Sequence, residues 1–123
     1  MKRTPLQRRT RLKPMSAKRR AEHDASRPVV RAVFERDGGC VLARYVGPAT
    51  VPACFGALTP HHLRKKSALG QWTRRNLVTL CSSHNNWVEC QPALARELGL
   101  VIRDGDTEHG AWLRLGEALG IHP

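Results

Sequence analysis

Residues 58–89 concentrate side chains that bind metal ions and accept protons. His61 and His62 come first, and a cysteine, a histidine and an asparagine follow within residues 81–85. Histidine nitrogen, thiolate sulfur and side-chain oxygen are the atoms with which proteins hold divalent metals. A neutral histidine is also the natural general base near neutral pH. This stretch therefore predicts a site that combines metal binding with acid–base chemistry.

The two neighbouring histidines suit separate tasks. In an extended strand, adjacent side chains point to opposite faces, so His61 and His62 cannot readily bind one metal ion together. We expect one of them to be a metal ligand and the other a general base. The alternative, two incidental surface histidines, is disfavoured by the ligand types that follow in the same stretch.

A short helix at the end of the stretch can serve two metal sites. Cys81 and His84 have the two-residue gap of a zinc half-site. On a helix that begins near Ser83, His84 and Asn85 lie about 100° apart around the axis. Asn85 and Glu89 are four residues apart and share one face. We therefore expect one site on each side of this helix.

Four cysteines supply the rest of a structural zinc site. Cys40 and Cys54 are the obvious partners of Cys81 and His84, which gives a tetrahedral Cys3His set. In a reducing compartment, cysteines are more often metal ligands or buried thiols than disulfides. Structural zinc adds folding free energy to a domain of this size. Cys90 is a spare candidate ligand, and a set of buried thiols without metal is the alternative.

The charge of the chain points to a polyanionic partner. The formal net charge is +11 and the isoelectric point is about 10.8. Residues 1–36 carry twelve Lys and Arg against three acids, whereas residues 37–123 carry nine against seven. Nucleic acid is the first expectation and an acidic membrane surface the second. The expected phosphate contacts in the basic N-terminal region are Arg8, Arg9 and Arg11, and a solubilising tail is the alternative.

Further basic side chains flank the predicted site. These are Arg64, Lys65, Lys66, Arg74 and Arg75. They are placed to hold backbone phosphates on both sides of a scissile bond, and an ordinary solvated loop is the alternative. Trp72 in the same loop could stack on a base or pack the loop, and packing is favoured. Trp87 and Trp112 are expected in the core.

The elements that must position these residues are short. We expect a flexible basic arm over residues 1–15 and one α+β domain over residues 16–123, with a core at about 34–91 and an extension at 92–123. No segment approaches the ~20 apolar residues that span a bilayer, and the N-terminus lacks the apolar centre of a signal peptide. A cytoplasmic location, with no membrane partner, is therefore expected.

Local patterns predict the individual helices and strands. Ser16 suits an N-cap, Pro28 suits the first turn of a second helix, and residues 63–75 suit a loop. The expected helices cover residues 16–26, 28–36, 83 to 89 or 90 (capped by Ser82 or Ser83), 92–98 and 111–119. The expected strands cover residues 40–46, 55–59, 77–80 and 100–103, and the first two form a hairpin that leads into the histidine pair.

Taken together, these motifs resemble the HNH endonuclease family, particularly its small phage and prophage members. The matching segments are FERDGGC at 34–40, LTPHHL at 58–63, RRNLVTLC at 74–81 and SSHNNWVE at 82–89. The resemblance covers a little under half of the chain. It implies an α+β fold with a small ββα-metal (His-Me finger) core, flanked by helices and stabilised by zinc.

The resemblance also implies a role for each matched residue. His61 stands where the family has a metal ligand, and His62 where it has the general base. Asn76 matches the middle asparagine, which holds the catalytic loop and orients the base. Asn85 falls at the third motif position, and Glu89 lies where some members supply another ligand. Cys81 and His84 match the second half of the family's zinc knuckle.

The sequence departs from the family pattern in two places. The usual third histidine is Asn85 here, so the catalytic metal is assigned to His61 and Asn85, with His84 as the rival of Asn85. The usual first knuckle is Cys-x-x-Cys, whereas this chain offers Cys40 and Cys54, with thirteen residues between them. The first departure bears on catalysis and the second on the structural zinc.

The implied function is metal-dependent nicking or cutting of DNA phosphodiester bonds. The cofactors would be a divalent ion (Mg, Mn, Ni or Zn) at the catalytic site and a structural zinc. Double-stranded DNA is the expected partner, with phage packaging or recombination proteins as further candidates, and the oligomeric state is left open. Two alternatives remain: a zinc-stabilised nucleic-acid-binding module that does not cleave, and a nuclease directed at RNA.

Overall fold

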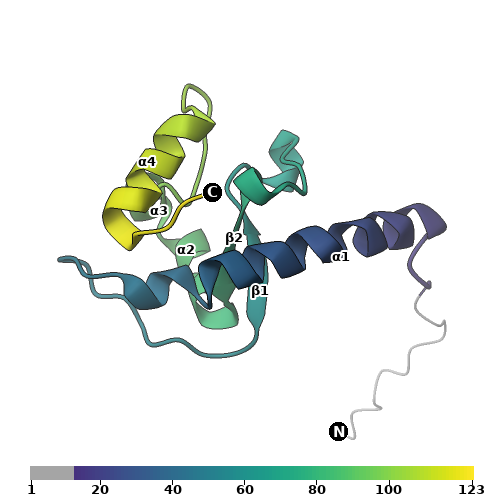
Figure 1. Cartoon of the computed structure of the whole chain (residues 1–123), viewed down its shortest axis with the longest axis horizontal. Coiled ribbons are helices and arrows are strands. Elements are labelled where there is room, and N and C mark those ends of the chain that lie inside the picture. The colour runs from purple at the N-terminus through teal and green to yellow at the C-terminus, as the bar shows by residue number, and fades with distance from the viewer. Residues whose placement is uncertain (1–12) are drawn as a thin grey trace, which may run out of the picture.

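A computed structural model describes residues 13–123 of the chain and has an α+β architecture (Figure 1). The coarse fold class predicted from the sequence is therefore confirmed. Its α-helices are α1 (Ala17–Asp37), α2 (Ser82–Cys90), α3 (Pro92–Leu98) and α4 (Glu108–Leu119). Its strands are β1 (Leu58–His62) and β2 (Leu77–Cys81), and single 3-10 turns cover Val41–Arg44, Lys66–Ala68 and Arg74–Asn76. Within the described residues, no helix has the length and apolar character to cross a membrane.

Strands β1 and β2 pair antiparallel, and this pairing corrects the predicted hairpin. The register sets Leu58 opposite Cys81 and His62 opposite Leu77. The predicted first strand, residues 40–46, is instead a 3-10 turn over Val41–Arg44. Val41 and Leu42 are adjacent and both buried, which an alternating strand with one solvent face does not allow. The strand beside β1 is instead β2, and every residue of β2 is buried.

Helix α1 is continuous, although two helices broken at Pro28 were expected. Ser16 caps it as predicted, because its Oγ accepts a hydrogen bond from the Arg19 amide. Pro28 has no N–H to donate to the carbonyl of Asp24, but both residues are exposed, so water can satisfy that carbonyl. The helix ends at Gly38 with φ of 69°, and its N-terminal half extends beyond the sheet (Figure 1).

A buried carboxylate fastens the C-terminal end of α1 to β2. Asp37 is 1% exposed, and its Oδ2 accepts a 2.8 Å hydrogen bond from the Thr79 amide. Arg36 donates to both carboxylate oxygens, at 2.8 and 3.1 Å. The same guanidinium donates to the carbonyl of Leu77 at 2.7 Å, which fixes the first residue of β2. The helix thereby sets the position of the strand that leads into Cys81.

Replacing Asp37 with asparagine is expected to destabilise the fold by about 3 kcal/mol. The change removes one charge of a buried ion pair, and the Arg36 guanidinium then lies in the protein without its counter-charge. Urea unfolding at fixed zinc concentration would measure the loss. Asp24→Asn, on the exposed surface of the same helix, is the matched control and is expected to change stability by less than about 0.5 kcal/mol. Equal midpoints for the two variants would contradict this role of Asp37.

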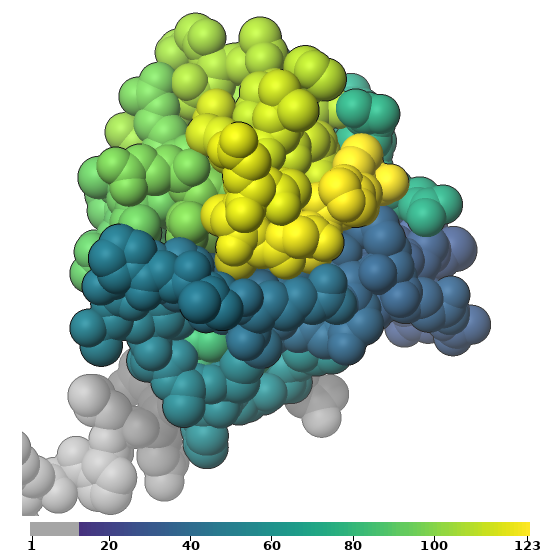
Figure 2. Space-filling model, turned by 60° about the vertical axis from the view of Figure 1, so that its left-hand side comes forward, coloured from purple at the N-terminus to yellow at the C-terminus, as the bar shows by residue number. Residues whose placement is uncertain are grey.

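The C-terminal third completes the core and supplies backbone to the site. Residues 100–103, predicted as a strand, form no regular secondary structure and pair with neither β1 nor β2 within the described part of the chain. The backbone of these residues contacts the loop that follows β1, where the Ile102 amide donates to the carbonyl of Leu63 at 2.8 Å. Helix α4 begins at Glu108, capped by Thr107, three residues earlier than expected. Figure 2 shows the C-terminal residues lying against the segment that follows α1.

Both tryptophans that were expected in the core pack there. Trp112 on α4 is buried in the core cluster, and its indole N–H donates to the carbonyl of Arg75. Trp87 on α2 is partly buried and packs against the same cluster. Helix α3 packs against both α2 and α4. These contacts hold α2 in place beside the sheet.

Candidate functional site

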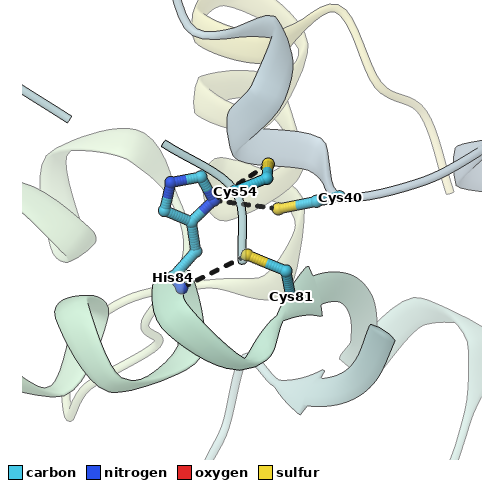
Figure 3. Close-up of side chains that lie close together, drawn as sticks. All are labelled: Cys40, Cys54, Cys81 and His84. Carbon is cyan, nitrogen blue, oxygen red and sulfur yellow. Dashed lines mark hydrogen bonds between the residues drawn. The ribbon is translucent and has the colours of Figure 1, made fainter. Parts of the chain in front are cut away.

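Three cysteines and a histidine converge where β2 meets α2. The ligand atoms of Cys40, Cys54, Cys81 and His84 all lie within 4.8 Å of one another. Figure 3 shows these side chains pointing toward a common centre from separate segments of the chain. Cys40 follows α1, Cys54 lies in the loop before β1, and Cys81 and His84 flank the start of α2. The predicted Cys3His grouping is thus present in the fold and could bind a metal such as zinc.

Backbone contacts orient the histidine of this cluster. His84 Nε2 lies 2.5 Å from the carbonyl oxygen of Pro52, and because a carbonyl only accepts, Nε2 carries the proton. The lone pair is then on Nδ1, which lies 3.1 Å from the sulfur of Cys40 and 3.6 Å from that of Cys54. A partner on the far ring nitrogen is the arrangement found behind metal-bound histidines in proteins.

The sulfur of Cys81 serves both the helix and the cluster. It accepts a hydrogen bond from the His84 amide at 3.4 Å, so Cys81 caps α2, where a serine cap was expected. Burial raises the pKa of the Cys81 thiol, but hydrogen bonds from the amides of His84 and Phe55, together with those from the other two cysteines of the cluster, lower it overall. For Cys54, partial desolvation and the adjacent Cys40 raise the pKa to about 11. One thiol of the cluster is therefore more acidic than usual and one less.

Three cysteine sulfurs and one imidazole nitrogen in one place form a donor set that suits a divalent cation. A bound divalent ion displaces the thiol protons and neutralises the charge that otherwise keeps neighbouring thiolates apart. Backbone hydrogen bonds hold the loop that carries Cys54 against the start of α2. The Ser82 amide donates to the carbonyl of Ala57, and the Ser83 amide donates to the carbonyl of Phe55. Gly56, with φ of 88°, lets this loop pass close to Ser82. Cys90 is exposed and lies outside the cluster.

The opposite side of α2 borders a small pocket that contains the histidine pair. This pocket has a volume of about 230 Å³. Its lining comprises Pro60, His61, His62, Lys65, Lys66, Asn85 and Glu89. The structure thus places His84 in the cysteine cluster and Asn85 beside His61, on two sides of one helix. His84 consequently does not compete with Asn85 for a place next to His61.

His61 is buried and held so that one ring nitrogen faces Asn85. Its Nε2 lies 2.7 Å from the carbonyl oxygen of Leu100, which assigns the proton to Nε2. Its Nδ1 lies 3.3 Å from Oδ1 of Asn85. Burial lowers the pKa of His61, against the opposing effect of the Leu100 and Asn85 contacts. The ring is therefore neutral at neutral pH and presents a lone pair toward Asn85.

His62 lies at the edge of the pocket and packs against Trp72. The two ring centres are 4.5 Å apart and the rings are nearly perpendicular. Among residues 13–123, His62 Nε2 has no hydrogen-bond partner although it is buried. Burial lowers the pKa of His62, and the nearby His61 and Lys66 lower it further. Because Nε2 is closed to solvent, it is Nδ1 of this neutral imidazole that can accept a proton from a bound molecule at neutral pH.

Asn76 closes the loop that surrounds His62. Its amide nitrogen donates to the carbonyls of Arg64 and Gln71, at 3.1 and 3.0 Å, and its oxygen accepts from the Arg64 amide at 2.8 Å. These bonds join the two ends of the loop that carries Trp72. Asn76 therefore positions Trp72, and through it the ring of His62, rather than contacting the pocket itself.

The basic residues predicted at the site divide into two groups. Lys65 and Lys66 line the pocket, where Lys65 pairs with Glu89 at 2.9 Å and Lys66 with Glu22 at 3.0 Å. Arg64 lines a neighbouring cavity of about 540 Å³ together with Lys65 and Glu89. Arg74 and Arg75 do not border the pocket, and Arg75 pairs with Glu108 on α4. The predicted contacts Arg8, Arg9 and Arg11 lie outside the described residues.

The sequence did not reveal the backbone groups that orient the two histidines. The carbonyls of Pro52 and Leu100 each accept a hydrogen bond from a ring Nε2, and both come from segments without regular structure. A carbonyl is present at every residue, so no residue type marks these two. The proline at position 52 and the apolar run after Gly99 were visible only as a loop and a strand.

Comparisons of the chain with models of known protein families, with curated proteins and with solved structures gave no match.

Proposed function

We propose that this protein is a metal-dependent endonuclease of the HNH type that hydrolyses DNA phosphodiester bonds. The observation that carries the proposal is the pocket that His61, His62 and Asn85 line together, in which His61 faces Asn85 and the imidazole of His62 is neutral. Strand β1 supplies both histidines and helix α2 supplies Asn85, and β2, which pairs with β1, leads directly into α2. This arrangement supports a ββα-metal core. The positive net charge of the chain supports a nucleic-acid substrate.

The donor atoms of His61 and Asn85 suit a divalent metal ion. With the proton on Nε2, His61 Nδ1 offers a lone pair, and the Oδ1 of Asn85 offers another only 3.3 Å away. Two such acceptors repel each other unless a cation or a donor lies against both. Ligands at ~2.1 Å from one ion are separated by about 3.0–3.4 Å, a range that includes the observed distance. Glu89 would join them after releasing Lys65.

The residues of the pocket would perform the reaction as follows. His62 accepts a proton from a water molecule as the water oxygen attacks phosphorus and the bond to the leaving sugar oxygen breaks. Lys65 and Lys66 contact the neighbouring phosphates and hold the strand in line. Asn76 keeps the loop closed so that Trp72 restrains the His62 ring. A divalent ion on His61 and Asn85 would stabilise the negative charge that develops on the phosphate.

The cysteine cluster would bind a structural zinc ion. Three sulfurs and one imidazole nitrogen are a common tetrahedral zinc set, and the backbone partner of His84 Nε2 presents Nδ1 for bonding. Zinc there would join the segment after α1, the loop before β1 and the start of α2. The ion would then hold α2, and with it Asn85, at the correct distance from the sheet.

A plasmid-nicking assay tests the catalytic proposal. Purified protein that contains its zinc is expected to convert supercoiled DNA to the open circle when Mg²⁺, Mn²⁺ or Ni²⁺ is added, because His61 and Asn85 supply nitrogen and oxygen donors. An RNA hairpin in the same assay tests the RNA alternative, since the base and the metal act on any phosphodiester. If supercoiled DNA survives with every metal, including Zn²⁺, the nuclease proposal is wrong.

One observation favours a second candidate, a zinc-stabilised module that binds nucleic acid without cutting it. The third position of the motif is Asn85 rather than histidine, and the Glu89 carboxylate is already paired with Lys65. The pocket then has two metal donors, which is a small set for a tightly held ion. The two candidates differ in the plasmid assay, where a binding module retards the DNA in a gel and leaves it supercoiled.

A further inference from the structure

A third cavity, a groove of about 770 Å³, lies between α1 and β1. Its floor is apolar and consists of Val30 and Phe34 from the helix and Leu58 and Pro60 from the strand. Trp72 forms one end. The side chain of Leu58 is 43% exposed, and Val30 and Phe34 are only half-buried, so the floor is open to solvent.

Two arginines stand along the helical wall of this groove. Arg27 and Arg31 are one turn apart on α1, share one face, and are both exposed. Glu35 is the one carboxylate among the described residues that line the groove, and it lies a further turn along. The groove thus pairs an apolar floor with a basic wall, which suits a ligand that has a flat apolar part and a negative charge.

The groove adjoins the proposed catalytic pocket. Pro60 lines both, and it directly precedes His61 and His62 on β1. Trp72, at the end of the groove, packs edge-on against His62 with ring centres 4.5 Å apart. A molecule that fills the groove would therefore touch the same two residues that border the proposed base.

We propose that this groove binds an unpaired nucleotide of the DNA strand next to the phosphate that is cut. The inference rests on the proposed nuclease function and specifies its substrate. The base would lie on the floor beside Phe34, and Arg27 and Arg31 would contact its phosphates. A base inside a duplex is stacked on its neighbours and offers no free face. The preferred substrate is accordingly DNA with a single-stranded segment beside the cleavage position.

Binding measurements on two DNA molecules test this inference. One is a blunt duplex, and the other is the same duplex with a short thymidine tail, each labelled with a fluorophore. The wild-type full chain is used with its zinc and without any added divalent metal, and a denaturing gel confirms that the DNA stays intact. Fluorescence anisotropy is expected to show about five- to tenfold tighter binding of the tailed duplex, because stacking of a base on an aromatic side chain contributes to affinity.

Variants of the groove should remove this preference selectively. Phe34→Ala is expected to bring the affinity ratio of tailed to blunt DNA down to between one and two. The double variant Arg27→Gln, Arg31→Gln changes only exposed side chains, so it tests the groove even if Phe34→Ala folds poorly. The double variant Arg19→Gln, Arg20→Gln is the matched control, because it removes the same two charges from the exposed N-terminal half of α1, outside the groove. It should weaken binding of both DNA molecules equally.

Two results would overturn the inference. One is equal affinity of the wild type for both DNA molecules, and the other is an affinity ratio of tailed to blunt DNA that stays unchanged in the groove variants. A groove that joins two copies of the chain would instead appear in light scattering as a dimer that Phe34→Ala dissociates, without a change in the ratio. Because no cutting is needed, the ratio can be read whether or not the plasmid assay detects nicking.

Discussion

The variant His62→Ala is expected to nick supercoiled plasmid about 10²- to 10⁴-fold more slowly than the wild type. This is the usual contribution of a positioned general base to the rate of a reaction. His62 lines the pocket, and burial lowers its pKa, so the ring is neutral at neutral pH as a general base requires. The initial rate of nicking under saturating Mn²⁺, measured on agarose gels, gives the comparison.

A matched histidine variant separates catalysis from folding. His109 is exposed on α4 and lies away from both the pocket and the cysteine cluster. His109→Ala is therefore expected to cut at the wild-type rate. Circular dichroism of His62→Ala should match that of the wild type, since the ring is only partly buried. A His62→Ala protein that folds and cuts as fast as His109→Ala would show that another group accepts the proton.

The variant Cys81→Ser is expected to lose both its zinc ion and its fold. Binding free energies of structural zinc are about 10–16 kcal/mol in small zinc domains, which is as large as the net stability of a typical domain. Cys81 also caps α2 through its sulfur and is 2% exposed in the core. Elemental analysis should find one zinc ion per wild-type chain and none per variant chain. The far-ultraviolet dichroism of the variant should fall toward that of an unfolded chain.

Cys90→Ser is the control for this experiment. Cys90 is exposed at the end of α2 and lies outside the cluster of candidate ligands. The same sulfur-to-oxygen exchange at this position is expected to leave zinc content and dichroism unchanged. A purified wild-type protein that is folded and free of zinc would remove the proposed structural site. It would leave the histidine pocket to be tested by nicking.

The ligand set was predictable from the sequence because few residue types can form it. Soft sulfur ligands are rare, and the two-residue gap between Cys81 and His84 already suggested half of a site. The helical step of about 100° then placed His84 and Asn85 on different sides of α2. The structure brings both pairs together as that geometry requires, with Asn85 beside His61 and His84 among the sulfurs.

The strand pairing was not predictable in the same way. Residues 40–46 form a short apolar run, and such a run fits a strand or a helical turn equally well. The pairing of β1 with β2 depends instead on a long loop that Asn76 closes with three hydrogen bonds. Asp37 likewise resembles any surface acid until the fold places it against Thr79. These contacts join residues that are distant in sequence, so local patterns do not report them.

The adjacent positions of His84 and Asn85 give α2 two donor sets of different chemical hardness. Three thiolates and an imidazole form a soft set that favours zinc, whereas an imidazole with an amide oxygen forms a harder set that accepts manganese or magnesium. Zinc nevertheless binds nitrogen and oxygen donors more strongly than manganese does. Scarce zinc would therefore go to the cysteines and complete the fold. Abundant zinc would also compete for His61 and Asn85, so the ion proposed to stabilise the fold would, in excess, displace the metal of the proposed catalytic site.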